Sequence, residues 1–177
     1  MRWMPFQYDG TEYDLQHLHP RTVVYTQPEK GANPPRNYTV DVIFSLHCFT
    51  RGLENENSDP GLLYSDSRET RIFDLRRYEL SKRLPGIIAN LTICKCFHTG
   101  RGNFFTIKIL DDICVPVEYE IYFTASKSPK AGIVNLYVQS AYARDVSHRG
   151  NRPRMKPISF SVILYNTLHK IPIIVPK

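Results

Sequence analysis

Short segments with strand-like alternation, separated by turn residues, fill most of this chain and constrain its fold more than any other feature. In residues 38–49, Val40, Val42 and Phe44 share one face of a strand, and the residues between them share the other. Further strands are expected at residues 22–26, 92–98, 103–110, 119–126, 133–143 and 158–165. Most of the connections contain turn-forming residues such as glycine and aspartate. The pattern predicts an antiparallel meander.

One segment, residues 67–84, has helical rather than strand spacing. The apolar side of its helical projection carries Phe73, Leu80 and Leu84. Asp66, followed three residues later by Glu69, resembles a capping box and predicts the start of this helix. Pro85 cannot continue a helix without the loss of a backbone hydrogen bond, so we expect a break near Leu84.

The predicted fold class is α+β, with an antiparallel β-sheet meander packed by one main helix, an N-terminal extension and a C-terminal strand. The length of 177 residues suits a single domain with its own core. The expected divisions are an extension with the first strand at 1–36, a core at 37–143, a basic loop at 144–157, and a C-terminal strand and tail at 158–177.

Positive charge is concentrated in two places. The chain has a formal net charge of +6 and a pI near 9.2, which favours a polyanionic partner. One basic group lies on the helical face opposite the apolar side, and the other lies in the basic loop. The predicted nucleic-acid-binding residues are Arg68, Arg71, Lys82, Arg149, Arg152, Arg154 and Lys156. We expect the partner to be RNA or DNA.

The four cysteines, Cys48, Cys94, Cys96 and Cys114, favour reduced thiols over a disulfide framework. Cys94, Cys96 and His98 alternate and would share one face of a strand, as metal ligands can. Structural zinc sites usually have a different spacing and a second ligand pair, so buried thiols are the preferred interpretation. The sequence predicts neither a metal nor another cofactor.

No run of residues approaches the roughly 18 apolar residues of a membrane span. The N-terminal residues contain no continuous apolar region and no cleavage site made of small residues, so no secretory signal is recognised. We therefore expect a cytoplasmic protein without a membrane partner.

The signatures of serine hydrolases, nucleotide triphosphatases and zinc enzymes are missing from the sequence. RNA cleavage needs less from a protein, because the ribose 2′-hydroxyl is the nucleophile and no metal is required. Histidine transfers protons near neutral pH, and arginine holds phosphate and stabilises developing charge. The candidate catalytic residues, all near predicted strand ends, are His47, His98, Arg101, Tyr142 and Arg144, and His148 is also suitable by type.

The segment Val138-Gln139-Ser140-Ala141-Tyr142-Ala143-Arg144 closes the predicted helix-and-strand unit. Residues 66–145 resemble in this respect the small RelE-type or barnase-like RNA-cleaving toxins. The resemblance implies that Tyr142 and Arg144 lie near a cleavage surface, with His98 and Arg101 contributed by the preceding hairpin. This chain is longer than those toxins and has an N-terminal extension and a further C-terminal strand.

Three functions remain open at the level of sequence. The first is a basic nucleic-acid-binding domain that is also a metal-independent endoribonuclease. The second is a nucleic-acid-binding module without catalysis. The third is a protein-interaction or scaffold role, in which the apolar C-terminal residues 158–175 pair with another chain, because the prolines there suit an edge or docking strand. Whether the protein is an enzyme is not decided by any motif.

Overall fold

The computed structural model describes residues 2–29, 31, 34–53, 59–100, 104–110, 118–144 and 156–175. The elements of these residues are β1 (Phe6–Tyr8), β2 (Thr11–Tyr13), η1 (Gln16–Leu18), β3 (Arg21–Gln27), β4 (Arg36–Phe44), η2 (Leu46–Cys48), β5 (Thr50–Arg51), η3 (Pro60–Leu62), β6 (Leu63–Ser65), β7 (Thr70–Phe73), α1 (Leu75–Ser81), α2 (Leu84–Ala89), β8 (Cys96–His98), β9 (Phe104–Leu110), β10 (Glu118–Lys127), β11 (Ile133–Ala143), β12 (Lys156–Ile158) and α3 (Phe160–His169), where η marks a short 3-10 helix. The predicted α+β class is confirmed.

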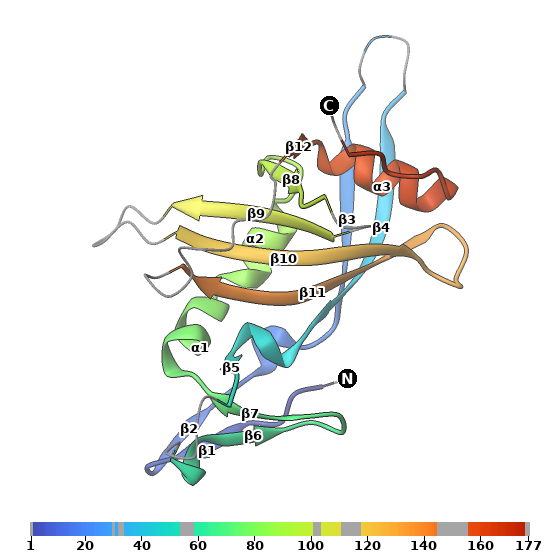
Figure 1. Ribbon diagram of the computed structural model, residues 1–177. Coiled ribbons are helices and arrows are strands. Elements are labelled where there is room, and N and C mark those ends of the chain that lie inside the picture. Colours follow the sequence, from blue (N-terminus) through green and yellow to red (C-terminus); the bar gives the residue numbers. More distant parts are fainter. Residues whose placement is uncertain are drawn as a thin grey trace.

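The main sheet runs in the order β12-β8-β9-β10-β11-β4-β3 across the described residues. Strands β8 to β11 are antiparallel neighbours in chain order, as a meander requires. Strand β11 then pairs in parallel with β4, and β3 pairs antiparallel with β4. Figure 1 shows the strong twist that results, with β9 to β11 running across the view and β3 and β4 nearly perpendicular to them.

The core lies against one face of this sheet. Ile121 and Phe123 of β10 point into it and are fully buried, and α2 lies behind these strands in Figure 1. Ile88 of α2 is also fully buried, and its carbonyl accepts a hydrogen bond from the Tyr25 hydroxyl on β3. The Tyr25 ring meets Phe160 of α3 edge to face, with ring centroids 5.0 Å apart. The helices therefore fix the core face and leave the other face of β10 and β11 for polar side chains.

A second sheet, β5-β7-β6, lies below the main sheet in Figure 1, next to the hairpin of β1 and β2. Aromatic side chains join the N-terminal residues to this small sheet. Phe6 stacks on Phe73 with ring centroids 4.2 Å apart, and Trp3 packs on Phe49 at 5.4 Å. Trp3 Nε1 also donates to the carbonyl of Phe44 at 3.1 Å. These contacts hold the N-terminal extension where β4 ends.

The helix expected at residues 67–84 is shorter than predicted, because its first part is strand β7. Asp66 caps a hairpin turn instead of a helix: its side chain accepts from the backbone N–H groups of Arg68 and Glu69. Such side-chain bonds to nearby backbone groups serve turns and helix starts alike. The true N-cap of α1 is Asp74, which accepts from Arg77 N. The basic helical face predicted for Arg68, Arg71 and Lys82 is therefore wrong.

The predicted break near Leu84 is confirmed, since α1 ends at Ser81 and α2 begins at Leu84 with Pro85 in its first turn. Strand β4 ends earlier than expected, at Phe44, and residues 46–48 form η2. The strand expected at 92–98 is confined to β8.

The expected strand at residues 158–165 is wrong, because α3 occupies residues 160–169 after the short strand β12. The buried side chains of α3 follow the helical period of i, i+3, i+4 and i+7. They are Phe160, Ile163, Leu164 and Thr167. In the described part of the chain, none of the helices is both long and apolar enough to cross a membrane.

Candidate functional site

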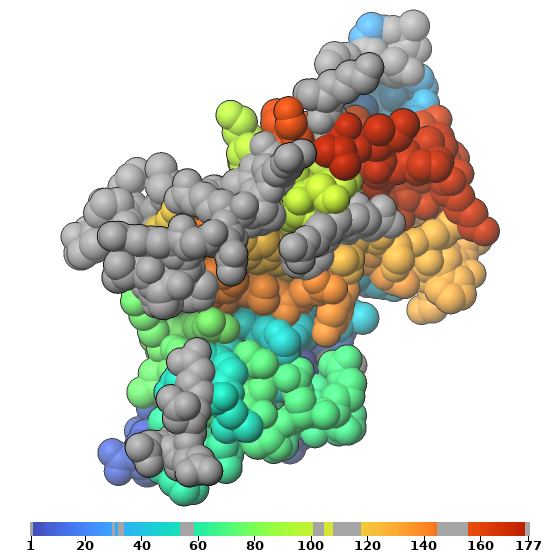
Figure 2. Space-filling view, viewed as in Figure 1, coloured from blue at the N-terminus to red at the C-terminus, as the bar shows by residue number. Residues whose placement is uncertain are grey.

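The candidate site lies where β4 leaves the main sheet. Strand β4 pairs with the first half of β11 alone, from Ile133 to Val138, and the chain then turns into η2. Ser45 N donates to the carbonyl of Val138 at 2.9 Å, which fixes this departure. On this edge the second half of β11 therefore borders η2 and α1 instead of a strand, while its other edge pairs with β10. In Figure 2 the orange residues of β11 lie directly above the cyan and green residues of the small sheet.

A β-bulge puts two tyrosines of β11 on the same face of the sheet. Phe123 of β10 pairs with Val138, but Tyr122 pairs with Ser140, so Gln139 is an extra residue on β11. Without it, Tyr137 and Tyr142 would point to opposite faces, because they are five residues apart. With it, both lie on the face away from the core.

A buried ion pair stands at the end of β11. Arg144 Nε donates to Glu120 Oε1 at 3.0 Å, and both side chains are almost completely buried. The Tyr122 hydroxyl donates to the other oxygen of Glu120 at 2.8 Å, and the Tyr122 ring stacks on Tyr142. Burial, followed by hydrogen bonds with Tyr142 and Glu120, raises the pKa of Tyr122. Burial is the largest single influence on the pKa of Arg144 and lowers it, but the hydrogen bond to Glu120 and the charges of Glu120, Tyr142 and Tyr122 together outweigh burial, so the net shift is upward.

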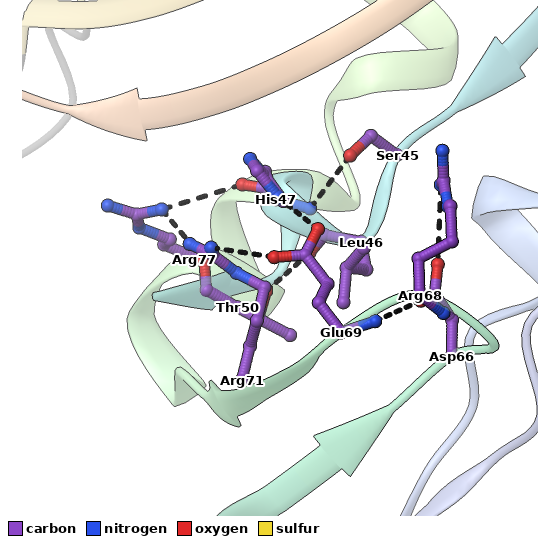
Figure 3. A network of polar contacts seen from close by, with 9 residues as sticks. All are labelled: Ser45, Leu46, His47, Thr50, Asp66, Arg68, Glu69, Arg71 and Arg77. Atoms are coloured by element: carbon purple, nitrogen blue, oxygen red, sulfur yellow. Dashed lines mark hydrogen bonds and ion pairs between the residues drawn. The ribbon is translucent and has the colours of Figure 1, made fainter. Parts of the chain in front are cut away.

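A second carboxylate, Glu69, joins η2 to the hairpin of β6 and β7 (Figure 3). One oxygen of Glu69 lies 2.8 Å from His47 Nε2, and the other lies 3.3 Å from Arg71 Nη1. The hydrogen bond with His47 is the main cause that lowers the pKa of Glu69. His47 is itself held by Ser45, whose hydroxyl oxygen accepts from His47 N at 3.1 Å. The result is a half-exposed histidine–carboxylate pair with an adjacent arginine.

Arg77 connects this pair to β11. Its Nη1 donates to the carbonyl of Thr50 at 2.7 Å and approaches the carbonyl of His47 at 3.5 Å (Figure 3). Its guanidinium also lies over the ring of Tyr142, 5.4 Å from the centroid. Burial lowers the pKa of Arg77. Arg77 forms no ion pair with a carboxylate of the described residues, whereas Arg71 and Arg144 each form one.

Arg68 adds one more cation beside β11. Its side chain pairs with Asp66 at 3.3 Å, and a hydrogen bond with Tyr137 is the main cause that raises its pKa. Arg68 of the hairpin and Arg77 of α1 thus each lie against a tyrosine of β11, and Arg71 and Arg144 lie nearby, each paired with a carboxylate. We call this set the arginine–tyrosine row, and its members are Arg68, Arg71, Arg77, Arg144, Tyr137 and Tyr142.

Five of the residues predicted from the sequence lie in or beside this row. They are His47, Arg68, Arg71, Tyr142 and Arg144. Three others lie elsewhere. His98 is buried on the core face beside Phe105. Lys156 lies opposite His98 in the backbone register of β12 and β8. Lys82 lies at the end of α1 and pairs with Glu79 at 2.8 Å.

The remaining predicted residues, Arg101, His148, Arg149, Arg152 and Arg154, lie outside the described residues, as does most of the basic loop at 144–157. Cys114 also lies outside them. Among the described side chains, no group of three histidine, cysteine or acidic residues is arranged to hold a metal ion. Burial raises the pKa of Cys96 to about 12 and also raises that of Cys94, which keeps both thiols protonated near neutral pH.

A cavity of about 610 Å³ lies apart from the row, between α3 and the ends of β3 and β4. Arg36 in its wall lies over the ring of Tyr165, 4.8 Å from the centroid, and Glu29 also lines it. None of the residues predicted for catalysis or nucleic-acid binding lines this cavity. It contains no histidine either, so the His47–Glu69 pair beside the row is the better candidate for proton-transfer chemistry.

Sequence reasoning missed four residues of the site: Arg77, Glu69 as a partner of His47, Tyr137 and Glu120. A partial signal was present for Glu120, a carboxylate between Tyr119 and Ile121 near the start of the strand. No local signal marked Arg77, since its role depends on a tyrosine 65 positions away in the sequence.

Comparison with known proteins places the chain in one family. The sequence profile of the YjaZ family matches residues 5–168. Protein YjaZ of Escherichia coli (strain K12) is 32% identical over 171 residues, which cover 94% of this chain and 91% of that protein. The chain therefore belongs to the YjaZ family. No solved structure shows a significant match.

Proposed function

We propose that this member of the YjaZ family binds a single strand of nucleic acid, RNA or DNA, along the arginine–tyrosine row. In this proposal Arg68, Arg71 and Arg77 hold phosphate groups and the two tyrosines stack on bases. The observation that carries it is that Arg68 of the hairpin lies beside Tyr137 and Arg77 of α1 lies over Tyr142, two tyrosines on one face of one strand.

Arg77 is the cation best suited to meet a phosphate. All of its hydrogen bonds to described residues pass through Nη1, so Nε and Nη2 remain available as donors. Neither Nε nor Nη2 of Arg77 is among the buried polar atoms that lack a hydrogen-bond partner. The carbonyls of His47 and Thr50 orient the guanidinium without neutralising its charge.

The repeated pairing of an arginine with a tyrosine favours a polymeric ligand over a small anion. Arg68 and Arg77 each contact a different tyrosine of β11, so cation and ring are paired at two successive places. A nucleic acid strand presents phosphate and base at regular intervals, which matches this alternation. The net charge of +6 adds long-range attraction for such a strand.

Fluorescence anisotropy with labelled single-stranded RNA and DNA of one sequence tests the proposal at low salt. Arg77→Ala should weaken binding about tenfold, because a charge-assisted contact to phosphate is lost. Arg76→Ala is the matched control, because Arg76 is the neighbouring exposed arginine of α1, and it should leave the affinity unchanged. Equal losses in both variants, or no binding by the unmodified protein, would rule the proposal out.

A second candidate is protein binding through residues 171–175, which follow α3 without regular secondary structure. Ile174 is 82% exposed, and Ile171 and Val175 are exposed as well. Light scattering of the full chain and of a chain that ends at Lys170 tests this candidate. Self-association that disappears with the truncation would support it, and two identical monomers would remove self-association from consideration.

A further inference from the structure

We infer that the His47–Glu69 pair makes this site a metal-independent ribonuclease, with His47 as the general base that activates the ribose 2′-hydroxyl. The inference rests on the proposed function, because a bound strand must bring its phosphates to Arg77. It goes further in naming RNA as the substrate and transesterification as the reaction.

The geometry of His47 suits a base. Nε2 lies 2.8 Å from Glu69 Oε1, so in the neutral ring Nε2–H donates to the carboxylate and Nδ1 carries the lone pair. No described residue forms a hydrogen bond with Nδ1. Glu69 is held in place by Arg71 and by the hairpin turn that Asp66 caps. Glu69 thus orients the ring and stabilises the imidazolium that forms, as the carboxylate of a catalytic triad does.

Cations suited to the transition state lie beside this base. Arg77 Nη1 approaches the His47 carbonyl at 3.5 Å, and Arg71 shares Glu69 with His47. Arg71 uses Nε for Thr50 Oγ1 and Nη1 for Glu69, which leaves its Nη2 without a described partner. The free donors of Arg77 and Arg71 would stabilise the charge that develops on the non-bridging phosphate oxygens.

The reaction needs no reactant other than RNA and water. His47 Nδ1 takes the proton of the 2′-hydroxyl, the 2′-oxygen forms a bond to phosphorus, and the bond from phosphorus to the 5′-oxygen breaks. The leaving 5′-oxygen takes a proton from water, and the resulting hydroxide is neutralised when His47 releases its proton. The products are a 2′,3′-cyclic phosphate and a 5′-hydroxyl end. DNA cannot react, because it has no 2′-hydroxyl.

The test uses the full chain with labelled RNA and with DNA of the same sequence, in the presence of EDTA. Binding and cleavage are measured in parallel. We expect RNA to be cleaved to cyclic-phosphate ends and DNA to be bound but left intact. His47→Ala should lower the cleavage rate about 100-fold and leave affinity nearly unchanged, and added imidazole should restore part of the rate. His169→Ala, purified in the same way, replaces an exposed histidine of α3 and should cleave normally.

Glu69 is a positioning residue in this mechanism. Glu69→Gln should slow cleavage with little change in affinity, and Glu69→Asp should recover more activity than Glu69→Gln. Salt-dependent binding without cleavage, or equal cleavage by His47→Ala, would overturn the ribonuclease and leave the proposed function standing. The absence of binding would overturn both.

Discussion

The two carboxylates beside the arginine–tyrosine row have similar partners but very different exposure. Glu120 pairs with Arg144 where the side chains are only 1% and 6% exposed. Glu69 pairs with His47 and Arg71, and its side chain is 38% exposed. A buried charge needs its partner, because no water replaces it, whereas an exposed charge can exchange its partner for solvent or a ligand. Glu120 therefore holds the site together, and Glu69 is free to take part in its chemistry.

The largest effect is expected from breaking the buried pair. Glu120→Ala leaves Arg144 buried without its carboxylate and removes the acceptor of the Tyr122 hydroxyl. The free energy of unfolding should fall by about 3–5 kcal/mol. Urea unfolding followed by circular dichroism measures it, with Glu79→Ala on the exposed side of α1 as the control. A loss no larger than that of the control would show that burial does not separate the two carboxylates.

A substitution at Arg77 tests the part of the arginine–tyrosine row that lies between Glu69 and Glu120. Arg77→Lys keeps the positive charge but loses the planar guanidinium that reaches two carbonyls and lies over Tyr142. We expect affinity for single-stranded RNA to fall several-fold, by about 1 kcal/mol, even though the net charge is unchanged. Anisotropy titration measures this, and Arg76→Lys should show no change. Full affinity in Arg77→Lys would mean that charge alone matters at this position.

Asp74 positions Arg77 through the backbone, because its side chain caps α1. Asp74→Ala should destabilise the protein by about 1 kcal/mol, as is usual for the loss of an N-cap. Asp74→Ser should recover most of that loss, because serine also caps helices well. Thermal unfolding of the three proteins checks this prediction, and equal stability of the alanine and serine variants would contradict it.

The smallest effect is expected at the exposed carboxylate. Glu69→Gln should lower the free energy of unfolding at neutral pH by less than about 1 kcal/mol. Because the pKa of Glu69 is lowered in the folded protein, its contribution is present above its ordinary pKa and disappears as the pH falls through the lowered value. The difference between wild type and Glu69→Gln should therefore shrink as the pH falls below the ordinary range of a glutamate carboxyl. A difference that grows in acid would contradict the sign of the shift.

Local sequence patterns predicted β3, β9, β10 and β11 closely, and the other strands and the site only in part. Strand β11 has the predicted bounds because its apolar positions and its glycine-containing turn agree. The convergence of His47 with Tyr142 could not be predicted, because it depends on where β4 leaves the sheet and on a bulge at Gln139. The helical period of α3 was present in the sequence, but its β-branched residues favoured a strand. Asp66 was misread because turns and helix starts use the same bonds.

The salt dependence of affinity for single-stranded RNA tests the central claim most directly. The logarithm of the binding constant of the unmodified chain should fall linearly with the logarithm of salt concentration. Arg77→Ala should reduce the magnitude of that slope by about 0.7, which corresponds to the loss of one phosphate contact on a single strand. Arg76→Ala should leave the slope unchanged. A slope in Arg77→Ala equal to that of the unmodified chain would contradict the assignment of the row as the nucleic-acid-binding site.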